Sequence, residues 1–153
     1  MPEPVVTQQM MFRLPVERVF EAFVNPERTT KFWFTHSDGP LKQGSQVTWE
    51  WRMYGCSTAV QVIEVIENQS IKIEWGEENA RSKVDWTFEQ RANQTTMVTV
   101  TNYGFSGDEN AILDEAINSM GGFSLVLANA KAYLEHGLDL NLIEDHAPDA
   151  HVT

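Results

Sequence analysis

The segment DENAILDEAINSMGGFSLVLANAKAYLEH, residues Asp108–His136, decides the fold that this sequence predicts. Its apolar side chains recur at intervals of three and four residues, which predicts one long helix with a wide apolar face. Ser106 and Asp108 are residue types that cap helix starts, and Gly137 stands where a helix commonly ends in left-handed backbone. A helix with one apolar face must bury it against another layer of structure. The face comprises Ile112, Leu113, Ala116, Ile117, Met120, Phe123, Leu127, Ala130, Lys131 and Leu134.

The second layer is predicted by the segments before this helix, where apolar and polar side chains alternate. Val47, Trp49 and Trp51 fall on one face of a strand, with polar residues between them. The same period of two recurs in further segments joined by short turns, which predicts an antiparallel meander with one packed face and one wet face. These segments are 57–66, 71–75, 84–89 and 95–103.

Two short helices are predicted between a first strand, residues 5–13, and the meander. Pro15 suits the first turn of a helix because its missing N–H is not needed there. Asn25 ends that helix because the residue before a proline is pushed out of the helical region, and Pro26 then starts a second short helix. The predicted fold class is therefore α+β, with an antiparallel curved sheet of about six strands wrapped on the long C-terminal helix.

The length of 153 residues predicts a single domain. We assign residues 1–137 to this domain and residues 138–153 to an acidic C-terminal tail. The tail contains no Lys or Arg, so we interpret it as a solvated segment, with a docking site for a basic partner as the alternative. Its acidic residues are Asp139, Glu144, Asp145 and Asp149.

The charge of the chain and its lack of a recognisable targeting signal limit the partners and the cellular location that we expect. There are 22 acidic against 11 basic residues, a net charge of −11, and no basic cluster, so we expect no nucleic-acid partner. The N-terminus lacks the pattern of a signal peptide, and no apolar run approaches the roughly 18 residues of a membrane span. A single cysteine, Cys56, excludes an internal disulfide. We therefore predict a cytoplasmic protein that does not enter a membrane.

The order of strand, two short helices, meander and long C-terminal helix resembles the helix-grip fold of the START-like (SRPBCC) superfamily. The stretch Pro15–Phe23, followed by Asn25-Pro26-Glu27 and Trp33-Phe34, is similar to the opening of the branch related to the activator of heat-shock-protein-90 ATPase, the AHSA-like branch. The resemblance covers roughly residues 4–137 and implies the fold more strongly than an activity. Further matching features are Gly44, Trp75, Tyr103-Gly104-Phe105 and the ending Tyr133–Gly137.

One departure from that branch lies in the middle of the long helix. Many members have a Gly-Trp pair where this chain reads Gly121-Gly122-Phe123. Two glycines inside a helix cost about 1 kcal/mol each relative to alanine. They indicate either a tolerated kink or close approach of helix to sheet, or space made for a ligand above the sheet.

A curved sheet that grips a long helix encloses an apolar pocket, the usual form of a small-molecule site. Each aromatic residue on the packed face could instead be ordinary core, and Trp33-Phe34 could form either the mouth of the pocket or a lid on the core. Glu64 would have a raised pKa if it pointed inward, and otherwise occupies the wet face. We predict ligand-binding contacts from Trp49, Trp51, Trp75, Trp86, Phe88, Tyr103, Met120, Phe123 and Leu127.

These observations favour a protein that binds a hydrophobic or aromatic small molecule. One alternative is an enzyme of the polyketide-cyclase or aromatase kind, for which Glu64, Asn102 and Tyr103 would supply the polar groups; another is a protein-interaction or co-chaperone-like module. The sequence identifies no catalytic residue, and because its four histidines show no paired spacing we predict neither a metal nor a cofactor. A homodimer could form through an exposed Trp33-Phe34 patch or an edge strand.

Overall fold

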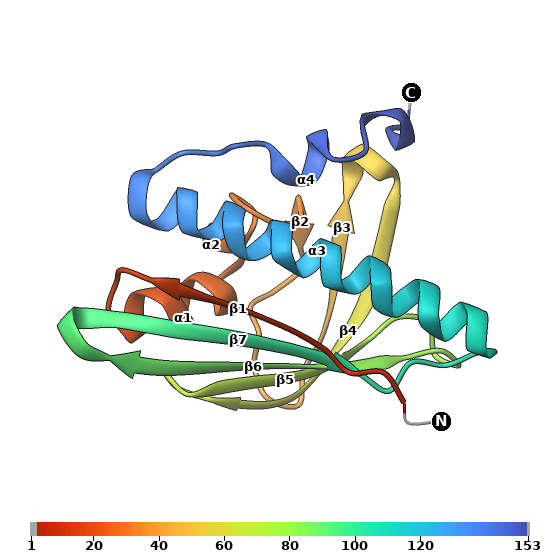
Figure 1. Ribbon diagram of the computed structural model, residues 1–153, viewed down its shortest axis with the longest axis horizontal. Helices are drawn as coiled ribbons and strands as arrows, with labels where there is room; N and C mark the ends of the chain where they lie inside the picture. The colour runs from red at the N-terminus through yellow and green to blue at the C-terminus, as the bar shows by residue number, and fades with distance from the viewer. Residues whose placement is uncertain (1–2, 153) are drawn as a thin grey trace.

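The computed structural model describes residues 3–152, in which one antiparallel sheet curves beneath a long helix (Figure 1). The sheet has seven strands in the order β1-β7-β6-β5-β4-β3-β2, which confirms the predicted helix-grip class. The added strand, β2, has two residues, too few for a periodic signal. The bounds are β1 (Val6–Phe12), α1 (Val16–Val24), α2 (Pro26–Thr29), β2 (His36–Ser37), β3 (Gln46–Trp51), β4 (Cys56–Ile66), β5 (Ser70–Trp75), β6 (Ser82–Arg91), β7 (Thr95–Tyr103), α3 (Glu109–His136) and α4 (Leu142–Asp145).

Side chains along the strands alternate between a packed face and an outer face of the sheet, and β4 contains one β-bulge. Trp86 on β6 lies opposite Val100 on β7, and both are buried. On β4 the register shifts between Val62 and Glu64, which is a β-bulge. A bulge bends its strand and strengthens the local twist. Glu64 consequently pairs with Lys72 on the outer face of the sheet.

An aromatic cluster closes one end of the fold, where α1 and α2 pack against β1 and β6. The ring centroid of Phe23 lies 5.3 Å from that of Phe32 and 5.8 Å from that of Phe88, while Phe20 approaches Phe88 at 5.3 Å. Phe12 meets Phe23 edge-on at 6.5 Å. These rings pack the space between α1 and the sheet.

Helix α3 lies along the concave face of the sheet (Figure 1). The Asp108 side chain accepts a hydrogen bond from the Ala111 N–H at its start, and Gly137 adopts left-handed backbone at its end. Phe123 and Leu127 are buried against the sheet, which makes α3 the core helix of the domain. By length and composition alone α3 is also long and apolar enough to cross a membrane, a property that the core helix of a domain can share.

The last residues fold back across the domain and form a strap, which we define as residues 138–152. Figure 1 shows the strap running above α3 towards the β3–β4 hairpin. The Asn129 side chain, 1% exposed, donates to Phe32 O (2.9 Å) and accepts from the Leu140 N–H (3.3 Å). Ile143 is buried in the main core. The acidic residues Asp139, Asp145 and Asp149 are exposed, while the apolar side chain of Ile143 anchors the strap to the core.

The last turns of α3 are tied to the end of β1 by a buried carboxylate. The Lys131 ammonium donates to Met11 O (2.7 Å) and to the Glu135 carboxylate, which also accepts from the Arg13 N–H (3.0 Å). Burial alone would raise the pKa of Glu135, but the hydrogen bonds from Lys131 and Arg13 outweigh it, so this pKa lies below its ordinary value. The ionised form of Glu135 thus stabilises the fold.

We expect Glu135→Gln to lower the free energy of unfolding at neutral pH by about 1.5 kcal/mol, the scale of a charge-assisted hydrogen bond. A carboxyl with a depressed folded pKa contributes stability above its unfolded pKa of 4.5 and loses it as pH falls through the folded pKa. The difference between native protein and variant should therefore vanish in acid. Urea unfolding between about pH 7 and about pH 3 tests this. Glu89→Gln, in an exposed pair with Arg91, is the control and should change little.

Candidate functional site

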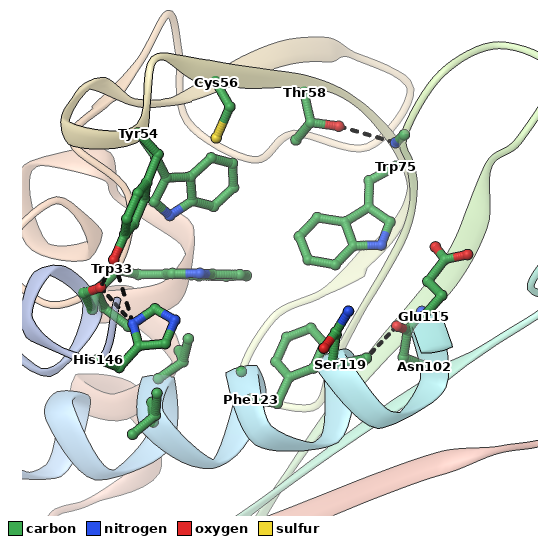
Figure 2. A pocket seen from close by; sticks show the side chains of 17 residues that line it. Trp33, Tyr54, Cys56, Thr58, Trp75, Asn102, Glu115, Ser119, Phe123 and His146 are labelled. Atoms are coloured by element: carbon green, nitrogen blue, oxygen red, sulfur yellow. Dashed lines mark hydrogen bonds between the residues drawn. The ribbon is translucent and has the colours of Figure 1, made fainter. Parts of the chain in front are cut away.

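A cavity of about 450 Å³ lies between the concave face of the sheet, α3 and the strap (Figure 2). Its wall comes from the strand ends of β3 to β5, from one side of α3 and from the strap. The lining residues are Trp33, Trp51, Tyr54, Cys56, Thr58, Trp75, Gly76, Asn102, Glu115, Asn118, Ser119, Gly122, Phe123, Leu125, Val126, Ile143 and His146.

Aromatic rings form the inner wall of this cavity, and Trp33 stands at their centre. Its ring centroid lies 6.2 Å from that of Trp51, 6.0 Å from that of Trp75 and 5.9 Å from that of Phe123. Trp75 stacks on Phe123 at 5.7 Å. Edge-to-face and offset arrangements of this kind are the favourable ones for aromatic pairs. The rings therefore hold one another in place and leave their remaining surfaces to the cavity.

A chain of hydrogen bonds fixes the wall on the side of β6 and β7. The indole N–H of Trp75 donates to the Ser82 hydroxyl at 3.0 Å, and the Asn102 amide donates to the same oxygen at 3.1 Å and to Lys83 O at 2.7 Å. The Ser119 hydroxyl on α3 donates to Asn102 Oδ1 at 2.7 Å. This chain orients Trp75 and ties the pocket side of α3 to the sheet.

The opposite end of the cavity is closed by the strap. The Tyr54 hydroxyl donates to Ile143 O and lies 3.4 Å from His146 Nδ1. His146 Nδ1 also lies 2.6 Å from Ile143 O, and because a carbonyl only accepts, the proton of this ring belongs on Nδ1. Burial raises the pKa of Tyr54, and the nearby carboxylates of the strap add to that effect. Tyr54 therefore serves as a neutral donor that holds the strap on the β3–β4 hairpin.

Glu115 is the one carboxylate among the lining residues that the structure describes. It projects from α3 at the side of the cavity opposite the strap, as Figure 2 shows. Burial raises its pKa. No Lys or Arg is among the described lining residues, and Glu115 has no ion-pair partner within residues 3–152.

The structure separates eight of the nine predicted ligand-binding residues into three groups, and the ninth, Tyr103, lies on the outer face of the sheet. Trp51, Trp75 and Phe123 line the cavity, and ligand contact by them stays a prediction. Met120 is 46% exposed, because residues 119 and 122 of α3 face the cavity and residue 120 is turned away. Four aromatic and aliphatic residues are buried in the core outside the cavity wall: Trp49, Trp86, Phe88 and Leu127.

The polar groups considered for an enzyme are not brought together. Asn102 lines the cavity, but Glu64 pairs with Lys72 on the outer face because of the bulge in β4. Tyr103 is also on the outer face, where its hydroxyl donates to Asp85 at 3.1 Å. The predicted set is therefore split between the two sides of the sheet.

Several lining residues were not found by sequence reasoning. Trp33 was expected at a mouth or lid, yet it is 7% exposed and central to the wall. Glu115 and Ser119 were missed because they are polar and lie outside the apolar pattern of α3, whereas space for a ligand at Gly122 was one of the two interpretations of the glycine pair. The spacing of four and three residues from Glu115 to Ser119 and to Gly122 is the helical signal that groups them. Tyr54, Ile143 and His146 meet through the return of the strap, which carries no local signal.

The two glycines in α3 are not sites of close approach, so that interpretation is wrong. A Cβ built on Gly121 or on Gly122 meets no atom within 4 Å. Gly121 is exposed, whereas Gly122 lines the cavity. Gly55 is different, because its φ is +61° and a Cβ there would lie 2.8 Å from Val152 Cγ1 of the strap.

A curved antiparallel sheet around a long C-terminal helix, with a cavity between the two, is the architecture of START-like helix-grip domains. The sequence places the protein within that class more narrowly. The model of the family described as "Activator of Hsp90 ATPase homolog 1-like protein" matches residues 13–135, and the chain belongs to this family. Among curated proteins, none matches the chain.

Solved structures share the fold at modest sequence identity. Protein SSP2350 from Staphylococcus saprophyticus is 29% identical with a TM-score of 0.76, over 90% of this chain and 96% of that one. DynU16, described as a putative protein of the dynemicin biosynthetic locus, is 21% identical with a TM-score of 0.79, over 90% of this chain but 49% of its own. The Aha1 dimer from Colwellia psychrerythraea is 17% identical with a TM-score of 0.75, over 88% and 98%.

The open space beside Gly121 and Gly122 leads to a prediction about stability. Gly121→Ala and Gly122→Ala should each raise the free energy of unfolding by about 1 kcal/mol, since alanine favours the helix and clashes with nothing. Gly55→Ala should instead lower it by about 1 kcal/mol or more, because alanine resists left-handed backbone and Val152 must shift. Urea unfolding of the three variants measures these changes. A loss of stability in Gly122→Ala would contradict the open cavity.

Proposed function

We propose that the protein binds a hydrophobic or aromatic small molecule in the cavity between the sheet and α3. The observation that supports this most is a cavity of about 450 Å³ walled by Trp33, Trp51, Trp75 and Phe123. Small-molecule sites commonly fall between about 300 and 1,000 Å³ with mostly apolar walls.

The glycines of α3 support the same proposal. Gly122 faces the cavity with no atom near its missing Cβ, although alanine would make a more stable helix. A helix position that gives up about 1 kcal/mol and enlarges a cavity is consistent with a ligand that supplies the missing contacts. The ordered aromatic wall would present preformed surfaces to that ligand, which limits the entropy lost on binding.

The cytoplasm remains our proposed location for this binding. The support is compositional: the chain has a single cysteine, Cys56, and so lacks the cysteine pairs that are common in oxidising compartments. An enzyme of the polyketide-cyclase kind is less favoured, because only Asn102 of its three expected polar groups reaches the cavity, and its amide is already engaged.

The binding proposal is tested by filling the cavity from α3. Gly122→Leu should weaken binding of the neutral probe N-phenyl-1-naphthylamine at least about tenfold, whereas Gly121→Leu, on the exposed side, should retain native affinity. Fluorescence titration measures the affinities. Cys56 lines the cavity, so its alkylation rate gives a second readout, slowed by the probe in native protein and in Gly121→Leu.

Absence of probe binding by native protein, or an equal loss in both leucine variants, would contradict the proposal. The natural occupant can be sought directly by native mass spectrometry of protein purified from its own host, followed by denaturation to release what is retained. An apolar molecule of defined mass, lost from Gly122→Leu and kept by Gly121→Leu, is the expected result.

We also propose a homodimer, which rests on other residues than those that the sequence suggested. The Trp33-Phe34 patch suggested by the sequence does not exist, because both side chains are buried. The supporting observations are the description of the Colwellia protein as a dimer and the exposed apolar row Leu113, Ile117 and Met120 on the outer side of α3. Apolar surface of this kind gains free energy when a second copy covers it.

If α3 contributes to such a dimer, Ile117→Asp should shift the protein towards monomer with little change in folding, because Ile117 is 61% exposed. Sedimentation equilibrium over a range of concentrations measures the shift. Glu109→Gln, at the start of the same helix, serves as the control for a distant surface change. A native protein that stays monomeric at every concentration would remove the proposal.

A further inference from the structure

We infer that the cavity selects aromatic ligands that carry a positive charge, with the charged group beside Glu115, and that it rejects anionic ligands. This selectivity rests on the proposed binding function and deepens it by naming the charge of the ligand. The aromatic wall and the one carboxylate of the cavity each support it separately.

Among the described lining residues, Glu115 is the one that carries a charge of fixed sign, which is negative, and His146 is the one that can become positive. Glu115 supplies a carboxylate, and the described lining residues include no Lys or Arg. The other titratable side chains in the lining are Tyr54, Cys56 and His146, and Figure 2 shows all three on the side away from Glu115. An anionic ligand would therefore meet no fixed positive partner at the Glu115 end.

The aromatic wall adds to this preference. The face of an aromatic ring carries negative potential, which attracts cations, and tryptophan is the best of the rings in this respect. Three tryptophans, Trp33, Trp51 and Trp75, share the wall with Phe123. Trp51, Trp75 and Phe123 each pack on Trp33, with centroid distances of 6.2, 6.0 and 5.9 Å, and all four residues line the cavity. A cation in the cavity is attracted by any of these ring faces that it approaches.

Glu115 is a lining carboxylate without an ion-pair partner within residues 3–152. The buried carboxylate discussed above, Glu135, is paired with Lys131 and has a lowered pKa. Glu115 is exposed, and the partial burial of its side chain raises its pKa. A ligand cation at this end of the cavity would have the Glu115 carboxylate as its counter-charge. The net charge of −11 further favours the approach of cations.

Three donors of the wall beside Ser82 are already in use. The Ser119 hydroxyl donates to Asn102, the Asn102 amide donates to Ser82 and Lys83 O, and the Trp75 indole N–H also donates to Ser82. A ligand carboxylate that approached these three groups would have to break bonds within the protein to gain a donor. Buried charge without hydrogen bonds is strongly disfavoured.

A charge series on one aromatic frame tests the inference. The probes are 2-naphthyltrimethylammonium, its neutral isostere 2-tert-butylnaphthalene and the anion 2-naphthoate, each measured by displacement of N-phenyl-1-naphthylamine from native protein. The trimethylammonium group keeps its charge at every pH, and the tert-butyl group has the same shape. We expect the cation to bind about tenfold more tightly than the isostere, and the anion about tenfold more weakly.

Two variants of α3 assign the effect to one carboxylate. Glu115→Gln should reduce the preference for the cation to about threefold or less, with the affinity for the neutral probe unchanged. Asp114→Asn removes the same charge from the neighbouring exposed residue, which does not line the cavity, and should keep the full preference. Circular dichroism and thermal unfolding verify that both variants are folded.

The outcomes separate this inference from the proposed function. Equal affinities for the three probes, tightest binding of the anion, or an unchanged preference in Glu115→Gln would overturn the charge selectivity while leaving ligand binding in place. Failure of every probe, including the neutral one, to bind native protein would overturn the binding function and the selectivity together. A cation preference that Asp114→Asn keeps and Glu115→Gln loses supports both.

Discussion

The packing of Trp33 is the interaction on which the rest of the structure depends. Its ring contacts Trp49, Trp75 and Trp86 from the sheet and Phe123 from α3, so a single side chain joins the two layers. The α2 turn holds it there. The Trp33 N–H donates to Thr29 O at 3.0 Å, and the buried Thr29 hydroxyl donates to Ala22 O at 2.7 Å. Moving this ring would disturb the core and the cavity wall together.

The three sides of α3 lie in different environments. One side packs on the sheet through buried residues such as Leu127, a second presents Glu115, Ser119 and Gly122 to the cavity, and the third is exposed at Ile117. Most of the apolar burial lies in the C-terminal half, where side chains meet the main core. The N-terminal half is held by Ala116 in a small second cluster and by the Ser119 hydrogen bond, which leaves room beneath it.

Sequence reasoning predicted the fold well because the fold follows from periodicity. The alternation around Trp49 and the three-and-four spacing along α3 placed the sheet and the helix correctly, and the helix-grip class is confirmed. The site was harder to predict, since aromatic residues look alike whether they face a cavity or fill a core. Trp51 and Trp86 both alternate inward, yet only Trp51 reaches the cavity. The strap was missed because Ile143 finds its partners through long-range contacts that no local pattern describes.

The side of α3 that faces the cavity has a consequence for which mutations the domain tolerates. Residues 115, 118 and 122 lie outside the main core, whereas neighbours such as Phe123 and Leu127 are buried in it. Mutations at the first group can therefore alter the chemistry of the cavity without unfolding the domain, since surface changes away from packed sites usually cost little. The stability of the scaffold and the shape of its cavity are set at separate positions of one helix.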